Sequence, residues 1–93
     1  MTRLLQTHDV VGFQIIEEEF IAAGGTETFT LAQTPLTDAD KLPGRNVQVF
    51  VDGVENRWMA TATLVTQWDA PLANQVRIPS LTISQVVLVR YAV

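Results

Sequence analysis

Residues 46–54 read N-V-Q-V-F-V-D-G-V, and this stretch decides the fold class. Side chains alternate between the two faces of an extended strand, so Val47, Val49 and Val51 share one face. Asp52-Gly53 follows at once. This residue pair is favoured by the two-residue type I′ hairpin turn, because both central positions of that turn need a positive φ. The stretch therefore predicts a strand that turns back on itself in an antiparallel hairpin.

Further strand signals lie on both sides of this hairpin. Residues 26–32 alternate apolar side chains with threonines, and residues 54–68 read as one long strand or as two strands joined by a bulge. Residues 75–78 form a short strand that Pro79 should end. Residues 85–93, Q-V-V-L-V-R-Y-A-V, are apolar on both faces, as is typical of a strand buried between layers. At a sheet edge such a strand would need to pair with another chain.

Residues 10–23 fit two periods. Their apolar residues recur near helical spacing, and the two glycines that follow could end a helix. Read as a strand, the middle glutamate of residues 17–19 shares a face with Ile16 and Phe20, and the outer two lie on the opposite face. Bulky and β-branched side chains favour the strand.

Together the signals predict an all-β fold, a small antiparallel β-sandwich or barrel of about 6–7 strands. Residues 10–93 should form this single domain, with a loop over residues 33–45 that is rich in turn-forming residues. Residues 1–9 are polar, and we expect a loose N-terminal arm that either frays or reaches a neighbouring subunit. Removing the arm should weaken attachment to a partner and leave the fold intact.

The composition predicts a partner for this domain. The chain has 93 residues, of which 47% are apolar and only 17% charged. A domain of this size builds one thin core, and large exposed apolar patches are uncommon on monomers. Part of the apolar surface should therefore be covered by another copy of the chain or by another protein.

Other classes of partner are excluded by the charges and by the absence of certain segments. The net charge is −4, and the six lysine and arginine residues are scattered, whereas binding to nucleic acid needs clustered positive charge. There are no cysteines, which excludes disulfides and thiolate metal sites. No stretch resembles a signal peptide or reaches the ~18 apolar residues of a membrane span. We expect a protein that is made in a cytoplasm, soluble there, and without a membrane partner.

The chain offers little for catalysis or metal binding. His8 is the single histidine and lies in the expected arm, so no His–His metal pair is possible. Residues 17–19 are interpreted as a solvated face, an edge protected by charge, or a rim contact to a basic neighbour. Asp38 and Asp40 are interpreted as turn residues, since calcium needs six to eight oxygen ligands. Without a positioned acid–base pair, we predict no enzyme activity, no catalytic or metal site and no cofactor.

Two tryptophans are candidates for binding. Trp58 and Trp68 would lie on one face of a continuous strand, and they could pack in the core, form a subunit interface or bind a sugar. Together with the apolar strand at residues 85–93, they give a set of candidate interface residues, Trp58, Trp68, Val87, Val89 and Tyr91.

The order of the motifs resembles a small β-sandwich domain that is common in tailed-bacteriophage virion proteins. In that domain an E-F-x-A segment and a glycine turn precede an F-T-L strand, a proline-containing loop, a V-x-V-F-V-[ND]-G strand and turn, and a last strand V-x-V-x-Y. The chain carries these motifs, in order, at residues 19–22, 24–25, 29–31, 35, 47–53 and 87–91.

The resemblance implies a non-enzymatic virion structural protein that decorates or cements the capsid surface. The implied assembly is a homo-oligomer, most often a trimer, bound to the major capsid protein or to another virion protein. The implied location is the virion, after synthesis in the cytoplasm of a bacterial host. Members with this domain also serve in tail fibres and tail appendages, so the alternative is a module that binds a glycan on the host surface.

Overall fold

A computed structural model describes residues 2–10, 13–36 and 46–93, with side chains from Gln14 onward. The described residues form strands, turns and loops, without a helix. Seven strands have at least five residues, and β6 has two. The strands are β1 (Thr2–Val10), β2 (Phe13–Ile21), β3 (Gly25–Thr30), β4 (Val47–Val51), β5 (Val54–Trp58), β6 (Gln67–Trp68), β7 (Gln75–Leu81) and β8 (Val86–Ala92).

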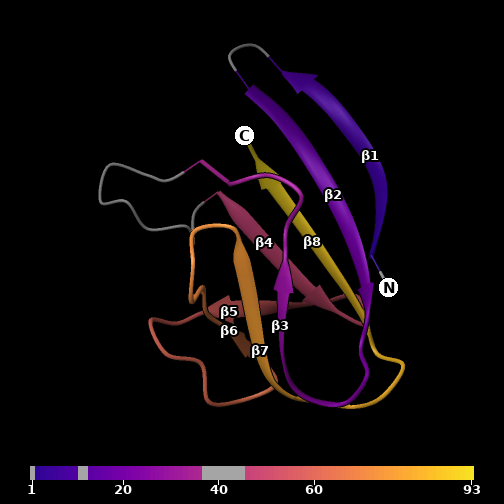
Figure 1. Ribbon diagram of the computed structural model, residues 1–93, viewed down its shortest axis with the longest axis vertical. Helices are drawn as coiled ribbons and strands as arrows, with labels where there is room; N and C mark the ends of the chain where they lie inside the picture. The colour runs from indigo at the N-terminus through magenta and orange to yellow at the C-terminus, as the bar shows by residue number, and fades with distance from the viewer. Residues whose placement is uncertain (1, 11–12, 37–45) are drawn as a thin grey trace.

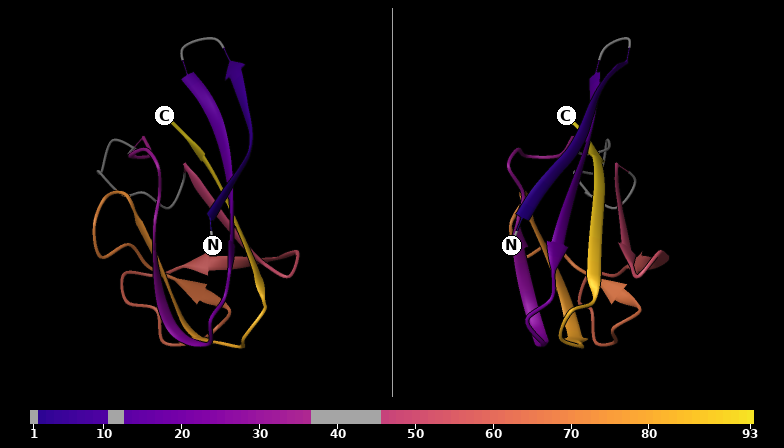
Figure 2. Two further views of the ribbon diagram at one scale, coloured as in Figure 1. Left: turned by 45° about the vertical axis from the view of Figure 1, so that its right-hand side comes forward. Right: turned by 90° about the vertical axis from the view of Figure 1, so that its right-hand side faces the viewer.

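The strands form two sheets that face each other (Figures 1 and 2). The larger sheet has six strands in the order β1-β2-β8-β4-β5-β6, and the smaller sheet pairs β3 with β7. All neighbours are antiparallel except β5 and β6, which run parallel. A bridge between Asp69 and Arg77 links the β6 end of the larger sheet to β7.

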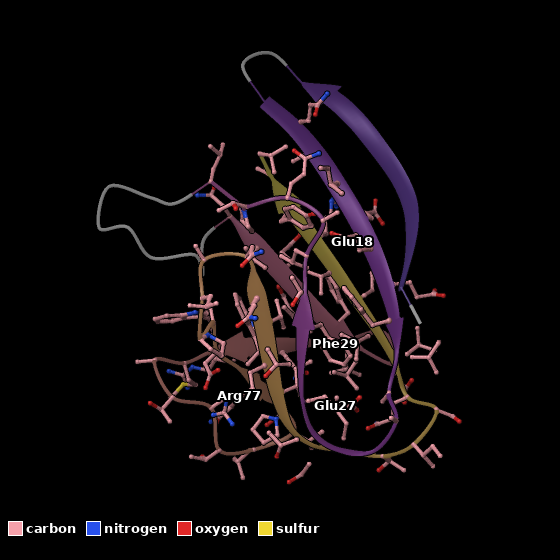
Figure 3. The ribbon with its side chains drawn as sticks, in the orientation of Figure 1. Glu18, Glu27, Phe29 and Arg77 are labelled. Atoms are coloured by element: carbon pink, nitrogen blue, oxygen red, sulfur yellow. The ribbon has the colours of Figure 1, made fainter. Side chains whose placement is uncertain are left out.

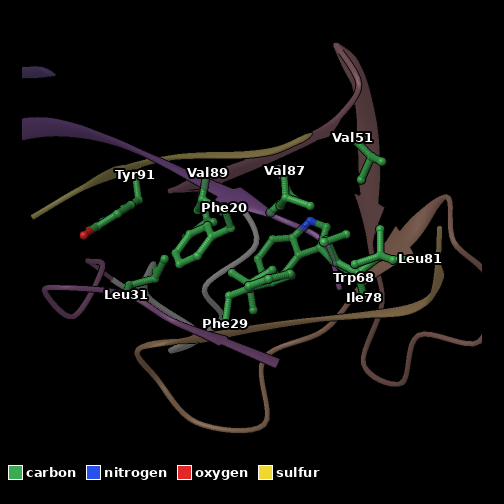
Figure 4. Close-up of a cluster of buried hydrophobic side chains, with 14 of the residues drawn as sticks. Phe20, Phe29, Leu31, Val51, Trp68, Ile78, Leu81, Val87, Val89 and Tyr91 are labelled. Atoms are coloured by element: carbon green, nitrogen blue, oxygen red, sulfur yellow. The ribbon is translucent and has the colours of Figure 1, made fainter. Parts of the chain in front are cut away.

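The hydrophobic core fills the space between the sheets. Phe20 of β2 and Phe29 of β3 meet across it, with ring centroids 4.8 Å apart (Figure 4). Each fully buried side chain of this kind stabilises the fold by roughly 1.5–3 kcal/mol. The other buried apolar residues of the strands are Ile16, Val47, Val49, Val51, Trp68, Val76, Ile78, Leu81, Val87, Val89, Tyr91 and Ala92.

The central predictions from the sequence are confirmed. The fold is a small all-β sandwich, and Val47, Val49 and Val51 are buried on one face of β4. The following turn has φ of 49° at Asp52 and 84° at Gly53, the positive pair that a type I′ turn requires. The strand interpretation of residues 10–23 is also correct, because β2 covers most of them.

The loose arm expected at residues 1–9 must be corrected. The backbone from Thr2 to Val10 forms β1, which pairs with β2 over its whole length. The polar composition of this segment suggested a loop. An edge strand in an antiparallel sheet nevertheless tolerates polar residues, because it pairs on one side only.

The long strand expected over residues 54–68 is wrong. β5 ends at Trp58, and the chain loops out before it returns beside β5 as β6. Asn56 closes this loop, since its Nδ2 donates to the carbonyl of Val65 at 2.7 Å and to that of Gln67 at 3.2 Å. Such side-chain bonds to the backbone compete with a sheet ladder, and alternation in the sequence does not reveal them.

Pro79 does not end its strand as predicted. β7 continues through it to Leu81, and the register with β3 shifts between the pairs Glu27–Ile78 and Gly25–Leu81. Ser80 in this bulge has a φ of 56°. A proline at a bulge removes no regular ladder hydrogen bond, so the strand tolerates it.

Candidate functional site

Glu18 and Tyr91 form a buried polar cluster between β2 and β8. Glu18 points into the sandwich and is only 2% exposed, and Tyr91 is 1% exposed (Figure 3). The hydroxyl of Tyr91 donates to Oε2 of Glu18, and the backbone N–H of Ala32 donates to the same carboxylate at 3.0 Å. The N–H of Gln33 donates to the Tyr91 hydroxyl at 3.3 Å. The cluster therefore fastens the segment after β3 to the larger sheet.

The surroundings of Tyr91 keep its hydroxyl protonated. Burial is the main cause that raises the pKa of Tyr91 above its ordinary value, and the hydrogen bond to Glu18 raises it further. A tyrosine that donates to a carboxylate in this way serves as a fixed hydrogen-bond donor, and its position is structural.

Asp69 and Arg77 form a second polar cluster at the junction of the two sheets. The guanidinium donates to the carboxylate through Nε at 3.0 Å and through Nη2 at 2.7 Å. Ala62 binds both partners, because its N–H donates to Asp69 at 2.8 Å and its carbonyl accepts from Arg77 at 3.0 Å. Burial alone would raise the pKa of Asp69, but the hydrogen bonds from Arg77 and Ala62 outweigh it and lower that pKa.

Both clusters act on the backbone of their own chain. Glu18 binds the segment after β3, and the pair Asp69–Arg77 holds the loop that contains Ala62. Within residues 14–36 and 46–93, no group of three or more histidine, cysteine or acidic side chains is arranged to hold a metal ion. These ionisable groups therefore serve as hydrogen-bond partners for backbone N–H and C=O groups of loops.

The two tryptophans are brought together, although not by a continuous strand. Trp58 and Trp68 are paired neighbours in the parallel strands β5 and β6. The ladder between β4 and β5 ends at Val49–Asn56, and beyond it lies a hollow of about 360 Å³ lined in part by both tryptophans. The indole Nε1 of Trp58 is buried and has no hydrogen-bond partner among the residues that the structure describes. It therefore does not point to open space in the hollow.

The outer face of the larger sheet is not covered by any described element (Figure 2). Its residues alternate with the buried ones, and they are half-buried or exposed apart from Ala92, which is only 7% exposed. Ile21, Val86, Leu88 and Phe50 form one apolar patch across β2, β8 and β4, and Ile15 lies apart from it, beyond the row of Glu17 and Arg90. We call this surface the outer face.

Two hollows mark the outer face. One of about 350 Å³ is lined by Glu19, Phe50, Gly53, Val86 and Leu88. The other, of about 370 Å³, lies at one end of this face, where the loop residues Leu36 and Asn46 line it together with Ile15, Gln48 and Arg90. Arg90 is exposed between them, and within the described part of the chain its side chain makes no hydrogen bond or ion pair. This face therefore combines an uneven apolar surface with an arginine that has no partner among the described residues.

Most of the predicted interface residues lie elsewhere. Trp68, Val87, Val89 and Tyr91 are at most 1% exposed, so they belong to the core of this chain and present no surface to a partner. The apolar character of residues 85–93 is typical of a strand buried between layers, and β8 does lie inside the sheet, between β2 and β4. The alternative, an edge strand that pairs with another chain, is wrong. Trp58 is the one member that remains partly exposed.

The remaining candidates from the sequence are distributed as follows. His8 lies on β1, where its backbone pairs with Ile15. Asp38 and Asp40 lie outside the described residues. The run at residues 17–19 divides as strand alternation predicts, but its middle residue is buried, not solvated. The shared face with Ile16 and Phe20 was the signal for this burial.

Comparisons with known proteins identify no relative of the chain. A scan against protein-family models gives no match, and neither the curated proteins nor the solved structures contain a significant match to the chain. Among the described residues there is also no helix that is long and apolar enough to cross a membrane.

Proposed function

We propose that the chain is a non-enzymatic structural protein of a tailed-bacteriophage virion, which decorates or cements the capsid surface as a homo-oligomer. The observation that carries the proposal is the outer face, where apolar side chains lie beside an arginine that has no partner in the described part of the chain, on a sheet face that no described element covers. The order of sequence motifs supports the assignment to a virion.

The proposed mechanism is the burial of surface. The buried ionisable groups hold loops and strands in place, which leaves a rigid sandwich with fixed outer surfaces. A rigid surface loses little conformational entropy when it binds. Many copies that bind a symmetric particle then add their contacts through avidity, so that each single contact can be weak. The partner would be the major capsid protein or another virion protein, in a particle assembled in a bacterial cytoplasm.

A second candidate is a tail-appendage module that binds a host-surface glycan. The hollow beside Trp58 and Trp68 favours it, because its lining combines indole rings with Glu55 and Arg57. The buried Nε1 of Trp58 cannot donate to a sugar in this hollow without a rearrangement, which makes this candidate the weaker one. Binding on a glycan array that is lost in Trp58→Ala would favour it over the capsid role.

Co-sedimentation tests the first candidate. The purified chain is mixed with capsids and, separately, with tails of the phage whose genome encodes it, and the bound fraction is measured. We expect saturable binding to capsids. Binding to tails alone would move the protein to the tail. Absence of binding to both particles, together with a mass in solution that stays that of a monomer, would overturn the proposal.

A further inference from the structure

The outer face has a regular layout that follows from the register of its strands. On β2 and β8, four directly opposed pairs face outward, and on β4 two residues continue their rows. Going along β8, the rows contain Ile15–Ala92, Glu17–Arg90–Gln48, Glu19–Leu88–Phe50 and Ile21–Val86. The row of Glu17 and Arg90 therefore lies between apolar positions, and Arg90 has no partner in the described part of the chain.

We propose that the outer face packs against the same face of a second copy, around a two-fold axis that runs parallel to β2 and β8 and between them. Such an axis places β2 of each copy over β8 of the other. Each residue then lies over the same type of residue that it pairs with in its own sheet. Glu17 of each copy then lies over Arg90 of the other, and Ile21 over Val86. Sheets packed face to face are ~10 Å apart, a gap that a glutamate and an arginine can bridge.

The charges select this axis over its neighbours. An axis along β8 would place Arg90 over Arg90, two like charges in a desolvated contact. An axis between β8 and β4 would exchange β2 with β5, and Glu19 would lie over Glu55, because both share the row of Leu88 and Phe50. Like charges opposed across an interface cost several kcal/mol, and this cost offsets the attraction of Glu17 to Arg57, which the same axis would bring together. The axis between β2 and β8 forms two attractive pairs without that repulsion.

Glu17 and Arg90 can each form the additional hydrogen bonds that such a contact requires. Glu17 and Glu19 each have an interaction within their own chain. A carboxylate accepts several hydrogen bonds, so Glu17 can also bind the Arg90 of the second copy. Arg90 makes no hydrogen bond or ion pair to the described part of its own chain, and the contact would give it a partner. The two reciprocal pairs make the interface isologous, as two-fold symmetry requires.

This inference rests on the proposed homo-oligomer and specifies it. The resemblance implied a trimer most often, but reciprocal pairs across one sheet face close an assembly of two. A dimer built in this way leaves the edge of β1 and the smaller sheet free, and these surfaces remain for contacts to the particle.

Charge reversal tests the dimer. The mass in solution is measured by sedimentation equilibrium for the native chain, Glu17→Arg, Arg90→Glu and the double variant, with circular dichroism as a check of the fold. We expect a dimer for the native chain, a dissociation constant at least about thirtyfold weaker in each single variant, and recovery of the dimer in the double variant. The matched control is Arg57→Glu, an exposed arginine on β5 that lies outside the contact, and it should not change the mass.

Each outcome decides a separate point. A monomeric native chain overturns the inference, and so does an assembly whose mass the single reversals leave unchanged. An assembly that Arg57→Glu dissociates would place the axis between β8 and β4, contrary to the proposal. Failure of the double variant to reassemble, although it folds, refutes the reciprocal pairing. A charge-dependent dimer that does not sediment with capsids or tails confirms the interface and counts against the virion role alone.

Discussion

Glu18 illustrates how one polar residue can organise a core. Its carboxylate accepts from the Tyr91 hydroxyl and from the N–H of Ala32, and Tyr91 in turn accepts from the N–H of Gln33. Burying a carboxylate among apolar side chains is costly unless hydrogen bonds compensate it. Here the carboxylate accepts from one backbone N–H of the segment after β3, that of Ala32, and the Tyr91 hydroxyl accepts from the next, that of Gln33. Burial of the carboxylate costs free energy locally, and the hydrogen bonds of the cluster fix the position of the segment after β3.

Glu18→Gln should lower the free energy of unfolding by about 1–3 kcal/mol, because an amide presents donors where the carboxylate accepted. Tyr91→Phe should have an effect of similar size, since it removes a donor to Glu18 and the acceptor of Gln33. The double variant should cost less than the sum, because the partners are coupled. Urea denaturation measures all three against Glu55→Gln, an exposed control. Strict additivity would contradict the coupling.

The ionisation of Asp69 determines part of the loss of folding stability at acid pH. Its folded-state pKa is lowered below the ordinary value of 3.8, so folding favours the carboxylate form. The corresponding stability is fully present above about pH 4, and it is lost as the pH falls through the folded pKa. The difference in unfolding free energy between the native chain and Asp69→Asn should therefore shrink as the pH is lowered from neutrality to below 3.8. Urea denaturation over that range measures it, and a constant difference would contradict the prediction.

At the scale of elements, the sequence predicts strands well where the core alone decides. β4 and β8 follow their alternation and their apolar content, because each has a sheet neighbour on both sides and a buried face. Prediction fails over residues 59–66, where the side chains of Asn56 and Gln67 bind the backbone of the loop. Such bonds depend on distances in three dimensions, and binary patterning of the sequence does not contain them.

The site was harder to predict than the fold, for a related reason. Apolar residues attract attention as binding candidates, yet the most apolar strand, β8, is central and its inward side chains fill the core. The outer face is recognisable only when the strand order is known, because its rows join β2, β8 and β4 from distant parts of the chain. In the sequence, Arg90 is one charged residue in an apolar run. In the sheet it lies opposite Glu17.

The pairing of β1 with β2 changes what truncation should do. Removing residues 1–10 would leave β2, a strand of nine residues, as an open edge. Open edges of this length template aggregation. We therefore expect the truncated chain to unfold at lower urea concentration and to aggregate on heating, as light scattering would detect. Removal of Met1 alone is the matched control. A truncated chain that retains the native urea midpoint would show that β1 contributes little to the fold.

At the scale of the whole molecule, the two sheets are unequal. Six strands face two, so the larger sheet has a covered inner face and an outer face that no described element covers. In many antiparallel sandwiches the outer faces are solvated and polar. Here the outer face carries Phe50, Leu88, Val86 and Ile21. A sequence under selection for a monomer would be expected to place polar residues at these positions, which is an argument for assembly.

Assembly through this face predicts a concentration-dependent thermal stability. A partner that binds the folded chain and not the unfolded chain stabilises the fold by mass action, so the Tm of a dimer rises with protein concentration. The native chain should show this rise in differential scanning calorimetry. Arg90→Glu should have a Tm that is independent of concentration. This Tm should lie somewhat below the dilute limit of the native chain, because the substitution places a second carboxylate opposite Glu17 in the same sheet. Arg57→Glu should retain the rise. If Arg90→Glu lowered Tm equally at all concentrations, the arginine would stabilise the single chain, and the outer face would lose its assigned role.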